Sequence, residues 1–440
     1  MHRLLLSAAL ALTLVPLAVA DDWPQWLGPK RDSTWREAGI VDKFPEGGLK
    51  ERWRVKAGLG YAGPAVAGGR VYLMDRVLAE GATNPTNPFV KPPIQGTERV
   101  LCLNAKNGEE LWKHEYPCTY EVSYAYGPRC TPTVDGKRVY TLGTMGDLRC
   151  LDAEKGDLIW SKDFKKDYSA PVMMWGFASH PLVDGKKLIC IVGGKGSVAV
   201  AFDKETGQEL WKSLSVKKET GYSSPDIIEA AGKRQLLIWT GEALNSLDPE
   251  TGQLFWSVPL DPNMGMAIAT PRKAGDHVFV GAAFNKALLL KLASDKPAAE
   301  EVWHGSGDKG IGSVNSTPFI EGDFLYGVDN QGQLTCVKVA TGERLWQTAE
   351  PVTGKDKANS GTAFLVKNGD RFFLFTETGD LVIARLTPEK YEEVSRTKLL
   401  EPLTPAMGGR KVVWSHPAFA DKCVFARNDK EIACYSLAKE

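Results

Sequence analysis

The stretch Asp203-Lys-Glu-Thr-Gly-Gln-Glu-Leu-Trp211 decides the fold, because its pattern recurs along the chain. A polar residue opens the pattern, a glycine follows four residues later, and a tryptophan follows four residues after that glycine. Five copies keep this spacing: Asn104–Trp112, Asp152–Trp160, Asp203–Trp211, Asp248–Trp256 and Lys338–Trp346. Polar residues with glycine are typical of a tight turn, since glycine adopts positive φ without strain.

Two degenerate copies extend the series and end at Trp303 and Ser395, so that successive copies are 48, 51, 45, 47, 43 and 49 residues apart. A second marker, a proline after a small or polar residue, runs in phase with the first, from Gly63-Pro64 to His416-Pro417, with Ser360-Gly-Thr-Ala363 in one slot. The two markers together define the starts of eight repeat units. Each start is followed by β-branched and aromatic runs separated by glycine turns. We therefore predict an all-β fold, an eight-bladed β-propeller of four-stranded blades.

The last unit is one strand short, because too few residues follow Pro417 for four strands. The stretch Leu49–Val55, which contains Trp53, has the pattern of the missing outer strand. We expect this N-terminal strand to complete the eighth blade and to remove two open sheet edges. The predicted propeller is one domain over residues 49–440. Residues 21–48 form a non-repeat leader that we expect to pack across the ring, and Leu78–Thr97 is expected to be a loop inserted in blade 1.

The first twenty residues have the features of a secretory signal peptide. A positive start at Arg3 is followed by an apolar run from Leu4 to Val19, and Ala18-Val-Ala20 resembles a cleavage site. The apolar run is shorter than the ~20 residues that span a bilayer. We therefore expect a periplasmic or secreted protein without an integral membrane segment. The chain has 54 basic and 54 acidic residues, and this balance does not favour a nucleic-acid partner.

The repeat resembles the pyrroloquinoline-quinone (PQQ) repeat, and the resemblance covers nearly the whole chain after the signal segment. The stretch Asp22-Trp-Pro-Gln-Trp-Leu-Gly-Pro29 resembles the start of exported bacterial PQQ-binding-like β-propeller repeat proteins. The superfamily contains quinoprotein alcohol dehydrogenases and the propeller factor of outer-membrane assembly. The resemblance implies the fold, whereas the chemical function has to be inferred from the residues of the site.

The resemblance to the dehydrogenase members implies cysteines that stack the quinone and carboxylates that bind calcium. They commonly stack the quinone on a disulfide between adjacent cysteines, and this sequence has no Cys-Cys pair. They coordinate calcium through carboxylates, whereas Glu121 and Asp226 are among the few acids near the first strands. We predict no cofactor and no catalytic residue, with PQQ and calcium as the alternative. The assembly factor is a lipoprotein, and this sequence lacks the lipid-accepting cysteine.

In a propeller, the loops that precede the inner strands meet at the mouth of the central channel. Here those loops carry aromatic rings, two histidines and an arginine, a composition that resembles a binding site. The alternative is that the rings only pack the mouth. The predicted ligand-binding residues are Tyr124, Arg129, Trp175, His180, Trp414 and His416. Two histidines alone do not make a zinc site, and no metal site is predicted.

Eight cysteines in an exported protein raise the question of disulfides. Cys118 and Cys130 flank one loop and are the pair that we expect to close it, with separate buried thiols as the alternative. Cys423 and Cys434 would lie opposite each other across a two-residue turn, where a disulfide would be strained.

The function expected from the sequence is that of an exported, non-enzymatic binding or scaffold protein of the cell envelope. Its partner would be an envelope protein or a small polar ligand. The alternatives are a PQQ- and calcium-dependent dehydrogenase and an assembly factor for outer-membrane proteins. The oligomeric state has no signal in the sequence.

Overall fold

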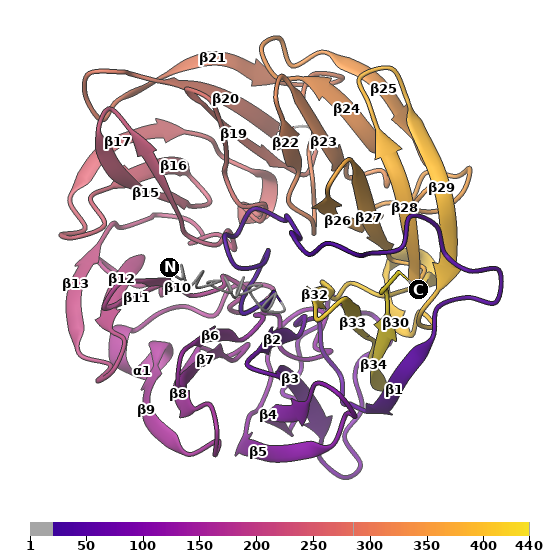
Figure 1. Ribbon diagram of the computed structural model, residues 1–440. Helices are drawn as coiled ribbons and strands as arrows, with labels where there is room; N and C mark the ends of the chain where they lie inside the picture. The colour runs from indigo at the N-terminus through magenta and orange to yellow at the C-terminus, as the bar shows by residue number, and fades with distance from the viewer. Residues whose placement is uncertain (1–20, 285, 440) are drawn as a thin grey trace, which may run out of the picture.

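A computed structural model describes residues 21–284 and 286–439 of the chain. Within these residues, eight four-stranded antiparallel sheets stand around an axis as the blades of a ring, and a small two-stranded sheet accompanies them (Figure 1). The prediction of an eight-bladed propeller is confirmed.

Each blade runs from an inner strand near the axis to an outer strand at the rim. Blades 1 to 4 are formed by β2 Ala65–Ala67, β3 Arg70–Leu78, β4 Gly96–Asn104 and β5 Glu110–Pro117; β6 Thr133–Asp135, β7 Arg138–Leu142, β8 Asp147–Asp152 and β9 Leu158–Asp163; β10 Leu182–Asp184, β11 Lys187–Ile191, β12 Ala199–Asp203 and β13 Glu209–Ser213; and β14 Asp226–Ala230, β15 Lys233–Trp239, β16 Ala243–Leu247 and β17 Leu254–Pro259.

Blades 5 to 7 follow in the same order. They are formed by β18 Arg272–Ala274, β19 His277–Ala282, β20 Lys286–Leu292 and β21 Ala299–Gly305; β22 Phe319–Glu321, β23 Phe324–Val328, β24 Leu334–Lys338 and β25 Arg344–Thr348; and β26 Ala363–Asn368, β27 Arg371–Thr376, β28 Asp380–Leu386 and β29 Tyr391–Lys398. The small sheet pairs β30 Thr404–Pro405 with β31 Lys411–Val412 between blades 7 and 8.

The eighth blade joins the two ends of the chain. Its first three strands are β32 Ala418–Ala420, β33 Cys423–Arg427 and β34 Glu431–Ser436, and its outer strand is β1 Glu51–Lys56. β1 runs antiparallel to β34 and places Trp53 beside Cys434. The predicted closure by the N-terminal strand is confirmed, and it locks the ring because neither end of the sheet can peel away without breaking this pairing.

The repeated turn and tryptophan hold neighbouring blades together. The Trp112 ring of blade 1 lies over the turn of blade 2, where its Nε1 donates to the carbonyl of Ala153 at 3.1 Å. Gly156 in that turn has φ of 76°, and a Cβ atom there would lie 2.5 Å from the Trp112 ring. The glycine is therefore required by both the backbone conformation and the packing. Equivalent bonds join Trp53 to Ala105, Trp160 to Lys204, Trp211 to Pro249, Trp303 to Val339 and Trp346 to Thr387.

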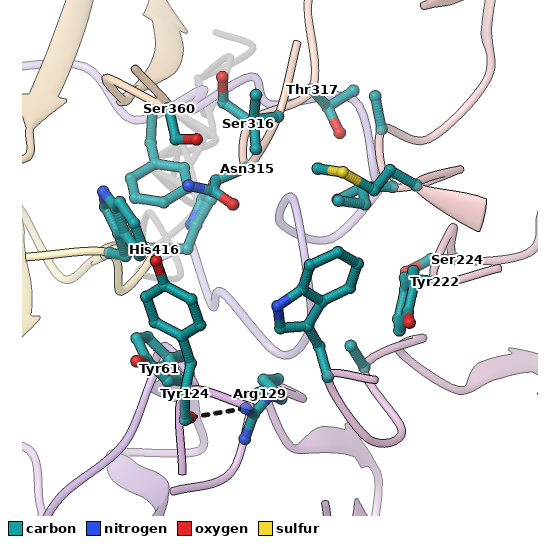
Figure 2. A pocket seen from close by; sticks show the side chains of 18 of the residues that line it. Tyr61, Tyr124, Arg129, Tyr222, Ser224, Asn315, Ser316, Thr317, Ser360 and His416 are labelled. Carbon is teal, nitrogen blue, oxygen red and sulfur yellow. Dashed lines mark hydrogen bonds between the residues drawn. The ribbon is translucent and has the colours of Figure 1, made fainter. Parts of the chain in front are cut away.

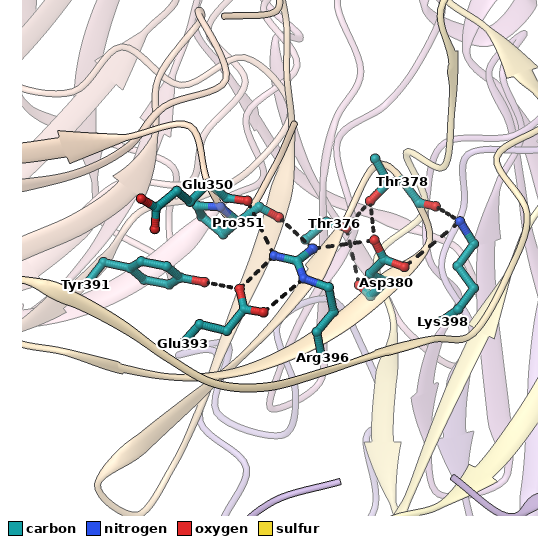
Figure 3. Close-up of polar contacts among 9 residues, drawn as sticks. All are labelled: Glu350, Pro351, Thr376, Thr378, Asp380, Tyr391, Glu393, Arg396 and Lys398. Carbon is teal, nitrogen blue, oxygen red and sulfur yellow. Dashed lines mark hydrogen bonds and ion pairs between the residues drawn. The ribbon is translucent and has the colours of Figure 1, made fainter. Parts of the chain in front are cut away.

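Polar contacts add to this packing between blades 6 and 7. Arg396 on β29 forms an ion pair with Glu393 at 2.7 Å and another with Asp380 at 3.4 Å (Figure 3). Its guanidinium also donates to the carbonyl oxygens of Glu350 and Pro351, which follow the outer strand of blade 6. One side chain thus ties the outer strand of one blade to the loop that leaves the blade before it.

The leader crosses the ring as expected, and Figure 1 shows it as the indigo segment that passes over the middle of the ring before β1. It pairs with the inner strand of blade 1 through Trp23 and Val66, and with that of blade 7 through Thr34 and Lys367. The buried Arg31 donates to the carbonyl oxygens of Pro181 and Pro225 at the starts of blades 3 and 4. The leader therefore fastens several blades at once.

Helical structure is sparse in the described part of the chain. It consists of α1 Phe164–Tyr168 and two short 3-10 turns, Asn263–Gly265 and Met407–Gly409. No helix in the described ranges is long and apolar enough to cross a membrane. The predicted signal peptide, residues 1–20, lies outside the described residues.

Candidate binding site at the ring axis

The loops that precede the inner strands enclose a cavity of about 280 Å³ at one end of the ring axis, which we call the axial cup. All six residues predicted from the sequence line it: Tyr124, Arg129, Trp175, His180, Trp414 and His416. The ring geometry thus brings together side chains that are as much as 292 positions apart in the sequence. That they bind a ligand stays a prediction.

One side of the cup is aromatic. The Tyr124 and Trp414 rings have centroids 6.0 Å apart, and Tyr61 lies 6.4 Å from Trp414. Trp175 contacts Tyr222 edge-on at 5.5 Å. Tyr124, Trp175 and Trp414 are only half-buried, so part of each ring faces the cavity. Such rings provide flat apolar surfaces on which a ligand can stack.

The opposite side carries hydroxyl and amide groups. Figure 2 shows Asn315, Ser316 and Ser360 across the pocket from Tyr61 and Tyr124. The Asn315 amide donates to Thr362 at 3.1 Å. Hydrogen bonds between described residues involve neither the hydroxyls of Ser316 and Ser360 nor the side-chain amide of Asn359. These groups are available to a bound molecule.

The leader supplies the floor of the cup. The Trp26 ring stacks on His180, with centroids 4.2 Å apart and planes 13° apart, and it contacts His416 at 4.7 Å. Its Nε1 donates to Thr270 at 3.3 Å. Trp26 is half-buried and lines the cavity. The axial cup is therefore built jointly by the propeller and by a segment outside the repeats.

The two histidines under Trp26 are held neutral. Burial lowers the pKa of His416 to about 4, and burial together with the charge of Arg31 lowers the pKa of His180 well below its usual range. His180 Nδ1 is 3.0 Å from the Ser224 hydroxyl. His416 Nδ1 is 2.7 Å from the Pro417 carbonyl, to which it donates. Both rings serve as packing platforms, in line with their equivalent places in the repeat.

We expect the neutral histidines to make the protein acid-sensitive. The unfolded chain protonates His416 near pH 6.5, whereas the folded chain does so only near pH 4. Stability from this residue is therefore complete above about pH 7 and falls as the pH drops from 6.5 to 4, by about 3 kcal/mol. The measurement is the free energy of unfolding in urea at several pH values.

His416→Gln is the control for this titration, because glutamine keeps a polar group in the slot and does not protonate. The loss of stability between pH 6.5 and 4 should be smaller in the variant by about 3 kcal/mol. Asp147, whose pKa burial raises to about 6, acts in the opposite direction in both proteins and cancels in the comparison. Parallel pH profiles would contradict the assignment.

Arg129 is less available to a ligand than the sequence suggests. Its Nη2 donates to the carbonyl oxygens of Ser123 and Tyr124 at 3.0 and 2.8 Å. Its Nη1 donates to Gly127 at 2.5 Å and to the Thr144 hydroxyl at 3.3 Å. The guanidinium therefore organises the loop that carries Tyr124, and this use could not be read from the residue type.

Trp414 is oriented by a buried carboxylate behind it. Glu377 accepts from Trp414 Nε1 at 3.0 Å and from the backbone N–H of Thr362 at 3.0 Å, and it pairs with Arg410 at 2.8 Å. Burial raises the pKa of Glu377, while the bonds to Trp414 and Arg410 oppose that rise. The carboxylate thus fixes the ring of Trp414 without lining the cup itself.

Several residues that line the cup have no counterpart among those predicted from the sequence. Trp26 comes from the leader, Phe89 from the loop inserted in blade 1, Phe284 from the turn after β19, and Phe364 from an inner strand. The insertion reaches the cup because the backbone N–H of Tyr124 donates to Pro88. The tryptophan-rich leader was the one available signal. The insertion supplies Phe89 to the cup only because its loop folds back over the ring axis, and the repeat pattern does not encode that path.

The expected Cys118–Cys130 disulfide is wrong in this structure, where both are buried free thiols. Cys118 packs with Tyr116 and Tyr120, whereas Cys130 belongs to the cluster between blades 2 and 3 and lies 3.4 Å from the Ser179 carbonyl. The loop between them carries the two thiols into different blade interfaces, and closeness in sequence is therefore not closeness in space.

Cys423 and Cys434 are also free, and they are not directly opposite each other. Cys434 pairs with Phe425, and Cys423 pairs with Ser436. The connecting turn is longer than two residues: Asn428 N–H donates to the Glu431 carbonyl, and the Asn428 side chain accepts from Lys430 and Glu431. The longer turn moves the register by two residues.

The axial cup does not fit PQQ with calcium. No carboxylate lines it within residues 21–284 and 286–439, and calcium is bound by converging oxygen ligands that usually include carboxylates. Asp226 is half-buried elsewhere, in the field of Arg31 and Arg272, and Glu121 is exposed. Among the described residues, no group of three or more His, Cys, Asp or Glu side chains could hold a metal ion. PQQ carries several carboxylates, whereas Arg129, a cation in the wall, is bonded to backbone carbonyls.

Comparisons with known families identify one match over more than half of the chain. The family described as "Outer membrane protein assembly factor BamB" matches residues 96–348. A relative of that name from Shewanella oneidensis is 23% identical over 259 residues, which are 56% of this chain and 64% of the relative. The quinohemoprotein alcohol dehydrogenase ADH-IIG of Pseudomonas putida is 28% identical over 150 residues, or 32% of this chain and 19% of the enzyme.

Solved structures share the fold. BamB from Moraxella catarrhalis superposes with a TM-score of 0.57 at 14% identity, covering 89% of this chain and 98% of that one. Quinohemoprotein alcohol dehydrogenase from Comamonas testosteroni superposes with a TM-score of 0.60 at 12% identity, covering 95% of this chain and 81% of that one. At these identities the similarity concerns the fold alone, and the chain spans less than two thirds of the Shewanella relative.

Proposed function

This chain belongs to the BamB family of PQQ-type β-propellers, and from that premise we propose that it is a non-enzymatic binding protein of the cell envelope. Its ligand or partner is recognised in the axial cup. The carrying observation is that the cup keeps three aromatic rings half-exposed inside a concave site. In the leader, by contrast, the rings of Trp23 and Trp35 pack against the ring of blades and are each 1% exposed.

The principal test is a pull-down from native envelope with wild-type protein and Trp175→Ala. Loss of a stacking ring at the centre of a binding site costs about 1–3 kcal/mol, and we expect capture to weaken about 5- to 150-fold. The melting temperature should fall only slightly, because Trp175 is half-buried and holds no slot between blades.

The control for this test is Arg129→Ala, which leaves the stacking ring in place and loosens the loop of Tyr124 by removing its bonds to carbonyls. It should weaken capture less than Trp175→Ala and lower the melting temperature more. If Trp175→Ala unfolds the protein while the folded fraction captures partners normally, the rings only pack the cup and the proposal fails.

A dehydrogenase is the alternative from another class, favoured by the quinoprotein relatives. Because the cup residues do not fit PQQ with calcium, we expect purified protein mixed with both to lose the quinone absorbance on desalting. No dye should then be reduced in the presence of alcohols or sugars. Retained absorbance together with dye reduction would replace the binding proposal with an enzymatic one.

A scaffold role in outer-membrane protein assembly is the second candidate, and the relatives named as assembly factors favour it at least as strongly. In that case the partners are envelope proteins. Co-purification of barrel-assembly components with the tagged protein would support this role. Capture of small molecules only, with none of those components, would count against it.

Export is part of the proposal. Relatives are envelope proteins by name, and residues 1–20 have the signal pattern. We expect the protein in the periplasm or the medium, with Asp21 as its first residue. N-terminal sequencing of the fractionated protein tests this, and an intact Met1 in the cytoplasmic fraction would overturn it.

A further inference from the structure

The wall of the axial cup offers almost no charge to a ligand. Arg129 is the one formally charged residue among the described residues that line it, and both of its terminal nitrogens already donate to backbone carbonyls. His180 and His416 at the floor are neutral because burial lowers the pKa of each. An anion or a cation that entered the cup would lose its water without gaining an opposite charge.

The two sides of the cup make different demands on a ligand. On the aromatic side, Tyr124, Trp175 and Trp414 present ring faces. On the polar side, the hydroxyls of Ser316 and Ser360 have no partner among the described residues. A wholly apolar ligand would strip water from these groups and leave them unpaired, which is unfavourable.

The floor and the size of the cup limit what can enter. Trp26 closes the base by stacking on His180 at 4.2 Å. The cavity of about 280 Å³ lies just below the roughly 300–1,000 Å³ range of ligand pockets. A single ring system fits this space, and a folded protein domain does not.

Resting on the proposed binding function, we propose that the axial cup binds a small uncharged ring compound that carries an amide or hydroxyl group. The ring stacks against Trp175 and Trp414 above the Trp26 floor. The amide or hydroxyl bonds to Asn315, Ser316 and Ser360. The ligand is a free small molecule or a side chain presented by a partner protein. In both cases a ring stacks on the tryptophans and an amide or hydroxyl forms the hydrogen bonds.

The test uses three indoles of equal ring size that differ in charge. Indole-3-acetamide is neutral, indole-3-acetate is an anion, and tryptamine is a cation at pH 7.5. Binding is measured by titration calorimetry on the full protein. We expect indole-3-acetamide to bind at least tenfold more tightly than either charged compound. Equal or tighter binding of indole-3-acetate or tryptamine would overturn the proposal. Tighter binding of indole-3-acetate, the anion, would assign an anion-binding role to Arg129.

Variants test the two sides of the cup separately. Ser316→Ala and Ser360→Ala remove lining hydroxyls that bond no other described residue, and they should weaken indole-3-acetamide several-fold while leaving 3-methylindole, which lacks the amide, unchanged. Trp175→Ala should weaken both compounds at least tenfold. Gln347→Ala on the outer strand β25 is the matched control and should change neither. Equal effects of Ser360→Ala on both compounds would overturn the assigned polar side.

The outcomes separate this proposal from the broader one. If charged and neutral indoles bind equally and Trp175→Ala abolishes both, the ligand class is wrong and the binding function stands. If no indole binds at millimolar concentration while envelope capture depends on Trp175, the ligand class is again wrong. If no indole binds and capture ignores Trp175, both proposals fail.

Discussion

Replacing Trp211 by alanine is expected to lower the free energy of unfolding by about 3–5 kcal/mol, which is the usual cost of deleting a large buried ring. The side chain is 9% exposed and fills the interface between blades 3 and 4. It covers the turn at Gly252, where a Cβ atom would lie 2.6 Å from the ring, and it donates to the Pro249 carbonyl at 3.2 Å. Alanine leaves a cavity between two rigid sheets that cannot collapse to fill it.

The matched control is Leu210→Ala on the same strand. Leu210 is 48% exposed and points to the other face of the sheet, so its loss should change stability by no more than about 0.5 kcal/mol. Chemical denaturation followed by circular dichroism measures both variants. Equal stability of the two would mean that the repeated tryptophans do not hold the blades.

Arg31→Ala is expected to release the leader from the ring, with a loss of about 3–5 kcal/mol in the stability of its docked state. Arg31 is 4% exposed and its guanidinium bonds to Pro181 and Pro225, and Arg272 donates to the carbonyl of Arg31 at 2.8 Å. Burial lowers the pKa of Arg31 to about 10, while attraction to Asp226 opposes that change. Alanine would leave the two carbonyl oxygens unpaired and Asp226 with one cation fewer.

Limited proteolysis measures this release directly. In Arg31→Ala, cleavage within residues 21–48 should be at least a hundredfold faster than in the wild type, while the blades stay intact. Lys30→Ala changes an exposed neighbour and serves as the control. Because Trp26 would leave with the leader, the variant should also lose ligand binding in the cup. A leader as resistant as that of the wild type would show that other contacts hold it.

The blades could be predicted from the sequence because their determinants are local. The five turns that keep the pattern have a glycine at positive φ, and in four of them an Asn or Asp side chain accepts backbone N–H groups, as Asp203 does for Glu205 and Thr206. Departures from this pattern are also local in origin. The segment between β20 and β21 lacks the Asp–Thr-Gly turn, and Trp256 instead donates to Gln235 within its own blade at 2.9 Å.

The pairing of cysteines could not be predicted, because it depends on distances that the repeat does not encode. A turn closed by Asn428 moved Cys434 away from its expected partner in the ladder. The loop that starts after β5 carried Cys118 and Cys130 into separate interfaces. The first error came from assuming a two-residue turn, and the second came from treating short separation in the chain as proximity in space.

The sequence by itself determined the eight blades, their closing strand and the set of loops that meet at the axis, since repeated turns and alternating strands act over a few residues. Only the tertiary structure decided which residues from outside these loops complete the cup and how its side chains are engaged. Trp26 becomes its floor because the leader is held at blades 3 and 4 by Arg31. Arg129 is turned toward carbonyls of its own loop. Such long-range contacts depend on where whole segments come to rest, and no short pattern in the sequence records that position.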